Sequence, residues 1–195
     1  MTLTRKQAEI RATILDQLYA KRPISRIDIS KETHITPATT GNIINELIKE
    51  GLVHELGELE DDSVGRKKTL LDITARQHFY LGFEISEKYL ALVIADNIGD
   101  ILASEWHTHH LEHQDGPSDI EIIQLIQHFL QKNKNISISA IGIGLPGHVK
   151  LDESQQIISK NPLWENINLK TIQDAFAVPV YFGNKSHCLT LAERL

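Results

Sequence analysis

Apolar residues recur at helical spacing in three segments of the first fifty residues. The first segment predicts an amphipathic helix from about Lys6 to Ala20. A second, shorter helix is expected to begin at Ser25, and a third runs from Pro37 to Gly51. The side chains expected to form their common core are Ile10, Ile14, Leu15, Leu18, Ile27, Ile29, Ile43, Ile44, Leu47 and Ile48.

Capping residues mark the ends of the second and third helices. Ser25 can accept a hydrogen bond from a free backbone amide, and Asp28 lies near the positive helix end. After a break at residues 33–35, Thr36 is a second cap and Pro37 takes the first helical position, where a missing amide proton removes no hydrogen bond. Two short helices joined by a tight turn are typical of a helix-turn-helix that binds DNA.

The third helix leaves a short polar face outward, which the spacing assigns to Thr39, Thr40, Asn42, Asn45, Glu46 and Lys49. Thr and Asn side chains can bond base edges or phosphates in the major groove, so this helix is the candidate recognition helix. The residues predicted to contact DNA from the helix pair are Ser25, Thr36, Ala38, Thr39, Thr40, Asn42 and Asn45. The alternative is an ordinary amphipathic helix of a helical domain.

Two strands with a basic tip follow the helices. The segments LVHEL at residues 52–56 and TLLDI at residues 69–73 predict a β-hairpin, the wing of a winged helix-turn-helix. Gly65 precedes Arg66, Lys67 and Lys68, and we expect Arg66 and Lys67 to contact DNA phosphates or a narrow minor groove. A solvated basic turn is the alternative, and the acidic residues at 58 and 60–62 must point away from DNA or weaken binding.

Beyond residue 78 the periodicity changes to that of strands. Three segments, FYLGFEIS, YLALVIAD and ILASEWH, predict an antiparallel meander with a turn at residues 97–99. A helix from about Ser118 to Lys132 leads into SAIGIGLPG, a buried strand that ends in a glycine-rich loop. A helix at 169–177, the strand VPVYFGN and a last helix at 185–195 follow. This order predicts an α+β fold on a mixed sheet, as in one lobe of an actin-like sugar kinase.

Composition limits the function further. The chain has 195 residues and 22.0 kDa, which allows two small domains, here predicted as 1–74 and 78–195. Residues 1–72 contain 11 Lys and Arg against 12 Asp and Glu, a balance of −1 of the total −6. Affinity for DNA must then come from local patches and from a dimer with two half-sites, so a homodimer is expected.

The sequence also bears on location and on the cysteine. Neither an N-terminal apolar run nor a stretch of roughly 18 apolar residues occurs, so we expect no membrane insertion and a cytoplasmic protein. Cys188 is the one cysteine, and we expect its thiol to be buried and unreactive.

Several motifs together resemble the ROK family, which groups sugar kinases with sugar-responsive repressors that carry an added N-terminal winged helix-turn-helix. The resemblance covers nearly the whole chain, through GRKKTLLDI, GFEIS, ALVIADNIGDIL, GIGLPGHV, NPLWENINL and VPVYFGNKSHCLTLAE. Within the family, the chain is similar to repressors of xylose operons. The resemblance implies a winged helix-turn-helix followed by a partial actin-like (ribonuclease H-like) ATPase lobe, a DNA operator as partner and a sugar such as xylose as inducer.

Two departures from the family pattern argue against kinase activity. ROK kinases carry a D-x-G-G-T phosphate loop, whereas this chain reads Glu84, Ile85, Ser86, Glu87 and Lys88, without the glycines and with added negative charge. At the E-N-D motif it reads Gly183, Asn184, Lys185, and a protonated lysine cannot act as the catalytic base. We therefore expect neither ATP as a cofactor nor phosphoryl transfer.

The family resemblance also implies a partial sugar site. Gly147, Asn161 and Asn184 match family positions near the sugar, although glycine-proline and asparagine-proline turns also occur for backbone reasons alone. The sequence ends before the family's zinc cluster and second lobe, so the sensor is expected to be half present. The histidines at 107, 109, 110 and 113 allow a metal site, but solvated histidines explain them with less structure, and no metal is assigned.

Three hypotheses remain from the sequence. The first is a DNA-binding repressor of a sugar operon, which binds DNA through its polar recognition helix. The second is a degenerate sugar kinase or sugar-binding protein, against which Lys185 and the missing glycines argue. The third is a truncated remnant without function, with an apolar patch around Leu189 and Leu191 left exposed.

Overall fold

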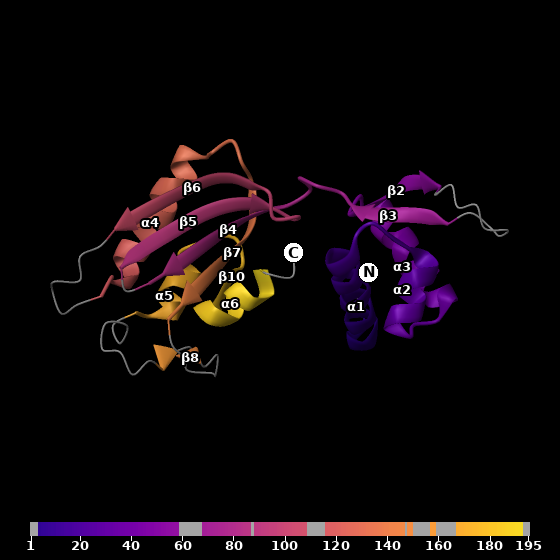
Figure 1. Cartoon of the computed structure of the whole chain (residues 1–195). Coiled ribbons are helices and arrows are strands. Elements are labelled where there is room, and N and C mark those ends of the chain that lie inside the picture. The colour runs from indigo at the N-terminus through magenta and orange to yellow at the C-terminus, as the bar shows by residue number, and fades with distance from the viewer. Residues whose placement is uncertain are drawn as a thin grey trace. The chain divides into compact units, whose positions relative to one another are not determined.

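A computed structural model describes residues 4–58, 68–86, 88–108, 116–146, 148–149, 157–158 and 167–192. The chain divides into two compact units, the first running to Gln77 and the second beginning at His78. The first, called the winged unit below, is drawn from indigo to magenta in Figure 1, and the second, the sheet unit, from magenta to yellow.

The winged unit consists of helices packed beside a small sheet. Its helices are α1 (Arg5–Lys21), α2 (Arg26–Thr33) and α3 (Pro37–Lys49), and its strands are β1 (Ile24–Ser25), β2 (Val53–Glu58) and β3 (Thr69–Ile73). The predicted wing is confirmed, because β2 and β3 pair antiparallel with a bulge between Glu55 and Gly57. The two-residue β1 pairs with the other edge of β3 and was not predicted.

The predicted helix caps are confirmed. The Ser25 hydroxyl accepts a hydrogen bond from the Asp28 amide, and the Thr36 hydroxyl accepts one from the Thr39 amide. Pro37 stands at the start of α3, and Gly51 follows its end with φ +76°, a conformation that glycine adopts at little cost. These local signals place both helix starts at the predicted residues.

Of the ten residues predicted for the core of the winged unit, five are buried, four are half-buried and one is exposed. The buried apolar side chains of this unit are Ile14, Leu18, Ile24, Ile29, Ile44, Leu47, Val53, Leu71 and Ile73. The predicted burial of Ile27 is wrong, since 50% of its surface is exposed. In an eight-residue helix, Ile27 and Ile29 lie on different sides, and only Ile29 points at the core.

The sheet unit is a five-stranded mixed sheet with the order β10-β7-β4-β5-β6. Its strands are β4 (Phe79–Ile85), β5 (Tyr89–Asp96), β6 (Ile101–Thr108), β7 (Ile138–Leu145) and β10 (Val180–Asn184), and β8 (His148–Val149) and β9 (Ile157–Ile158) form a separate pair. The predicted meander of β4, β5 and β6 is antiparallel, and β7 and β10 join it in parallel. The mixed sheet is therefore confirmed.

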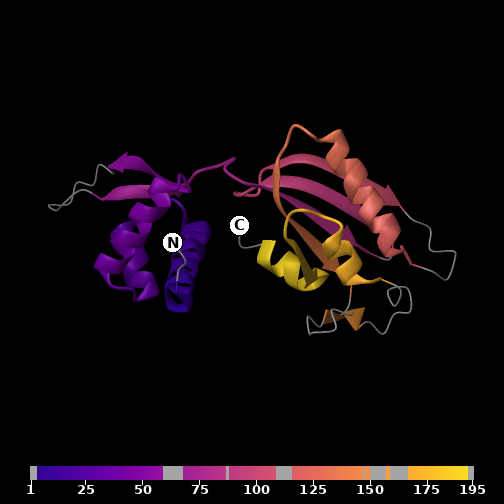
Figure 2. The ribbon, with the colours of Figure 1, turned by 180° about the vertical axis from the view of Figure 1, so that it is seen from behind.

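Helices cover one face of this sheet. They are α4 (Asp119–Lys132), α5 (Leu169–Asp174) and α6 (Lys185–Ala192), of which α4 lies across the strands in Figure 2. Apolar residues of α4 and α5 share one core cluster with alternate residues of β4, β5 and β7. The opposite face carries exposed aromatic side chains at Tyr80, Trp106 and Tyr181.

Two further expectations differ from the structure. Cys188 is exposed on α6, so its predicted burial is wrong. The helix expected to reach residue 177 ends at Asp174, with Ala175 as its C-cap. Within the described parts of the chain, no helix combines the length and apolar character needed to cross a bilayer.

Candidate nucleic-acid interface

The exposed side of α3 is mostly polar. Thr36, Ala38, Asn42 and Asn45 are exposed, and Thr39 is half-buried. Glu46 and Lys49 continue this side toward the end of the helix. The structure thus brings together five of the predicted DNA contacts on one surface, which we call the recognition face: Thr36, Ala38, Thr39, Asn42 and Asn45.

Thr40 does not belong to this surface. Its side chain is fully buried, so the predicted outward orientation is wrong. The reason is the helical repeat, because Thr40, Ile44 and Leu47 are four and seven residues apart and occupy one side of α3. Its hydroxyl has no hydrogen-bond partner among the described residues. Thr40 therefore packs on the buried side of α3 and cannot reach DNA.

Two threonine hydroxyls, those of Thr36 and Thr39, lie at the N-terminal end of the recognition face. The Thr36 oxygen accepts from the Thr39 amide at 3.3 Å, and the two hydroxyl oxygens lie 2.9 Å apart. Within this pair one hydroxyl donates to the other, which leaves one hydroxyl proton free to turn outward. The N-terminal end of α3, which reaches deepest into the groove in helix-turn-helix proteins, thus presents one hydroxyl donor.

Ser25 fixes the start of α2 from inside the fold. Its side chain is buried, and its hydroxyl donates to Asp28 Oδ2 at 2.6 Å. The ammonium of Lys68, the residue before β3, lies 3.2 Å from Asp28 Oδ1. The prediction of a direct DNA contact by Ser25 is therefore corrected, since its hydroxyl is enclosed by this cluster. Together these contacts fasten the base of the wing to α2.

Asp28 links this cluster to pH. The hydrogen bond from Ser25 holds the pKa of the Asp28 carboxyl below its ordinary value, and Lys68 acts in the same direction against the opposing effect of burial. A carboxyl whose pKa is lowered on folding contributes stability above its unfolded pKa and loses it as pH falls through the folded value. This contribution is therefore lost in acid below about pH 4.

We expect the Asp28→Asn variant to lose less stability than the parent on acidification below about pH 4. Lys68→Gln leaves the hydrogen bond from Ser25 in place and should therefore flatten the profile less. Urea midpoints measured across this pH range provide the test. Identical acid profiles for the parent and Asp28→Asn would show that the Asp28 contacts contribute nothing to folding.

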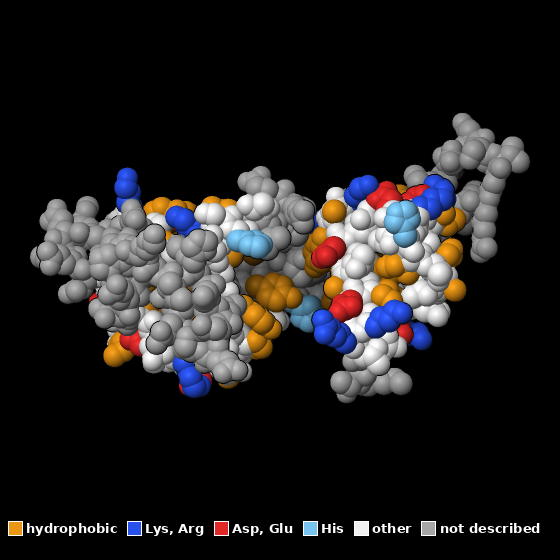
Figure 3. Space-filling view, turned by 90° about the horizontal axis from the view of Figure 1, so that it is seen from below, with side chains coloured by type: hydrophobic (Ala, Val, Ile, Leu, Met, Phe, Trp, Pro, Cys, Tyr) orange, Lys and Arg blue, Asp and Glu red, His pale blue; other side chains and the backbone are white. Residues whose placement is uncertain are grey.

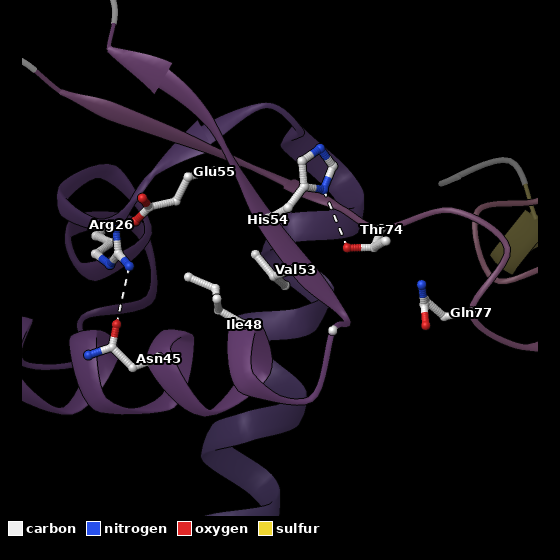
Figure 4. A pocket seen from close by; sticks show the side chains of 9 residues that line it. Arg26, Asn45, Ile48, Val53, His54, Glu55, Thr74 and Gln77 are labelled. Atoms are coloured by element: carbon white, nitrogen blue, oxygen red, sulfur yellow. Dashed lines mark hydrogen bonds and ion pairs between the residues drawn. The ribbon is translucent and has the colours of Figure 1, made fainter.

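Arg26 joins the recognition face to the wing. Its Nη1 lies 2.7 Å from Glu55 Oε1 of β2, and its Nη2 donates to Asn45 Oδ1 at 3.2 Å. Figure 4 shows the guanidinium between these two side chains, at the edge of a hollow of about 620 Å³. Arg26 was not among the residues predicted to contact DNA, although its position directly after the capping Ser25 was a usable signal.

The basic tip predicted on the wing lies outside the described residues. This applies to Arg66 and Lys67, to Gly65 before them, and to the acidic residues 60–62. On the face of the winged unit at the right of Figure 3, basic and acidic side chains are intermingled. Among the described residues on that face, the basic side chains form no continuous surface.

The sheet unit brings the two altered family motifs into contact. Glu84 at the end of β4 and Lys185 at the start of α6 form an ion pair of 3.4 Å between Oε1 and Nζ. The Tyr89 hydroxyl donates to the same Glu84 oxygen at 3.0 Å. The parallel register brings them together, because Glu84 pairs with Gly144 and Gly144 pairs with Gly183 on β10. A carboxylate and an ammonium thus neutralise each other at this end of the sheet.

Of the three residues predicted to lie near a sugar, the structure describes Asn184. Gly147 and Asn161 lie outside the described residues. Asn184 is half-buried, and its side-chain oxygen accepts from the His187 amide at 3.2 Å, which makes it a cap of α6. Among the histidines, His107 pairs with Glu105 at 2.7 Å, and positions 109, 110 and 113 are not described. No cluster of three potential metal ligands occurs in the described ranges.

Comparison with known proteins identifies both units. Residues 80–195 match the family model for the ROK family, and residues 8–54 match the model for winged helix-turn-helix DNA-binding. The xylose repressor of Bacillus spizizenii is 29% identical over 185 residues, which cover 93% of this chain and 47% of that protein. The DNA-binding transcriptional repressor Mlc of Escherichia coli is 28% identical over 187 residues, covering 93% and 45%.

A solved structure gives the same result. The crystal structure of a ROK family transcriptional regulator, a homolog of E. coli Mlc, matches with a TM-score of 0.66 and 27% identity. The match covers 95% of this chain and 48% of that one. The chain therefore spans about half the length of the curated relatives it matches.

Proposed function

Because the chain belongs to the ROK family, we propose that it is a sequence-specific DNA-binding repressor of a sugar-utilisation operon. The observation that carries this proposal is the polar recognition face on a helix seated by Ile44 and Leu47 beside a wing. Two of the relatives that the chain matches are named a xylose repressor and a DNA-binding transcriptional repressor.

DNA contact is assigned to the recognition face and to the wing. Thr39 and Asn42 read base edges, Thr36, Ala38 and Asn45 lie against the groove, and Arg66 and Lys67 bind phosphates. A homodimer presents two such surfaces to two half-sites, because a winged unit with a charge balance near −1 has little general attraction to DNA. The partner is double-stranded operator DNA.

The sheet unit reports sugar and does not transfer phosphate in this proposal. The Glu84–Lys185 ion pair supports the second part, since the ammonium that pairs with Glu84 cannot accept the proton of a sugar hydroxyl as a catalytic base would. Gly147, Asn161 and Asn184 are proposed to lie near a sugar such as xylose. Binding of sugar would shift the dimer between two spacings of its winged units and so change operator affinity.

A salt-controlled anisotropy titration tests the proposed function. The probes are DNA from upstream of the neighbouring sugar genes and a scrambled duplex of equal length, each with and without xylose or glucose. We expect saturable binding that prefers the upstream DNA, and release by one sugar. Equal affinity for the two duplexes at every salt concentration would contradict a sequence-specific repressor.

The recognition face predicts which side chains carry this preference. Asn42→Ala and Thr39→Ala should each weaken binding to the upstream DNA by about 1–3 kcal/mol, because each removes a base-edge contact. Thr13→Ala is the matched control, since Thr13 is an exposed polar residue on α1. Affinity for scrambled DNA should change little. Unchanged operator affinity in both recognition-face variants would contradict the assignment of these residues.

A further inference from the structure

The Arg26 network lies between the recognition face and the wing. Arg26 contacts Asn45 of the recognition face on one side and Glu55 of β2 on the other. Ser25, the residue before Arg26, is buried and is held by two hydrogen bonds with Asp28. The backbone of Arg26 is therefore fixed in the first turn of α2. Figure 4 shows that the three side chains converge from α2, α3 and β2.

This position places a cation beside the surface that is proposed to enter the groove. Asn45 is exposed, and Arg26 retains 29% of its side-chain surface in contact with solvent. A guanidinium offers five N–H donors in a planar fork, and two are taken by Glu55 and Asn45. The remaining donors can bond a phosphate of DNA whose groove holds α3.

Glu55 has the opposite effect on DNA. It is 47% exposed and carries a negative charge beside the same surface, where a bare carboxylate would repel the phosphate backbone. Paired with Arg26, its charge is neutralised in the free protein. A phosphate bound by the remaining donors shares the guanidinium charge with Glu55 and lies near its carboxylate, so each phosphate contact at this place is weakened.

We propose that Arg26 is a DNA phosphate contact and that Glu55 restrains it, which lowers affinity for DNA of any sequence. This inference rests on the proposed DNA-binding function and adds one contact and one restraining residue to it. The recognition face then contributes a larger share of the total affinity, because the sequence-independent part is reduced. Glu55 is in this sense a residue that sets specificity without contacting a base.

Three variants and a control test the pair. Arg26→Gln removes the cation, Glu55→Gln removes the restraint, and the double variant carries both changes. Glu50→Gln is the control, because it changes the net charge by the same amount as Glu55→Gln. Glu50 is likewise paired with an arginine, Arg11, and is 49% exposed. Each protein is titrated with the upstream and scrambled duplexes over a range of salt, after thermal unfolding has shown that it is folded.

The expected results have opposite signs. Arg26→Gln should weaken binding to both duplexes and reduce the slope of log affinity against log salt by about 1. Glu55→Gln should strengthen binding to scrambled DNA several-fold more than Glu50→Gln does. In the Arg26→Gln background, Glu55→Gln should add no more than the control.

Other outcomes overturn the inference in distinguishable ways. If the parent prefers the upstream duplex but Glu55→Gln behaves as Glu50→Gln, the restraint is absent and the proposed function stands. If Glu55→Gln keeps its full effect without Arg26, the carboxylate acts through general charge and the pair has no special role. If the parent binds neither duplex, the inference fails together with the proposed function.

Discussion

Replacing Phe83 with alanine should lower the free energy of unfolding of the sheet unit by about 3–5 kcal/mol. Phe83 is 2% exposed and lies on β4, which is bordered by β5 and β7. Its ring belongs to the cluster that joins the sheet to α4 and α5, so truncation leaves a cavity between the two layers. Urea unfolding at constant pH, followed by far-ultraviolet circular dichroism, measures the loss.

Tyr80 on the same strand provides the matched control. It points to the opposite face of the sheet and is 41% exposed, so Tyr80→Ala should cost far less than Phe83→Ala. The two variants remove an aromatic ring of similar size from one strand and differ mainly in burial. Equal losses in both would show that the open face of the sheet is packed against something as closely as the helix-covered face.

Local signals explain how far the sequence could predict this fold. Ser25, Thr36 and Pro37 act on their own turn of backbone, so their effect can be read within a window of a few residues. The strands of the meander alternate in burial and are joined by short turns, which fixes their antiparallel order. The two-residue β1 is too short to give any such pattern.

Two predicted orientations are wrong because residue type and helical position disagree. Thr40 is polar and was therefore expected outside, yet its spacing from Ile44 and Leu47 places it on the buried side of α3. Ile27 is apolar and was expected inside, but it lies away from the core on a helix of eight residues. On a short helix few residues define the buried side, so the assignment of a single residue depends on tertiary packing.

The contacts of the candidate sites depend on register, which no local pattern contains. Arg26 and Glu55 meet across 29 positions, and the bulge in β2 directly after Glu55 helps to set the direction of that side chain. Glu84 and Lys185 come together because two parallel strand pairs align Glu84, Gly144 and Gly183. Residue types at these places could be read from the sequence, but their pairing required the fold.

The second large effect is expected at Leu47, beneath the recognition face. Leu47→Ala should lower the free energy of unfolding of the winged unit by about 2–5 kcal/mol, because the side chain is completely buried under α3. Small domains have only about 0.05–0.15 kcal/mol of stability per residue, so a loss of this size removes much of the total. Hydrogen exchange of amides in residues 37–49, measured by mass spectrometry, reports the change in this unit directly.

Leu47→Ala and Asn42→Ala therefore separate the packing of α3 in the core from its proposed contacts with DNA. Asn42→Ala should weaken operator binding and leave hydrogen exchange in α3 unchanged, since Asn42 is exposed. Leu47→Ala should speed exchange throughout α3 and reduce binding only as far as the folded fraction falls. Glu46→Ala, an exposed neighbour on the same helix, controls for substitution at this end of α3. If Leu47→Ala instead exchanged like the parent but no longer bound DNA, Leu47 would act on the DNA itself, and the orientation assigned to α3 would be wrong.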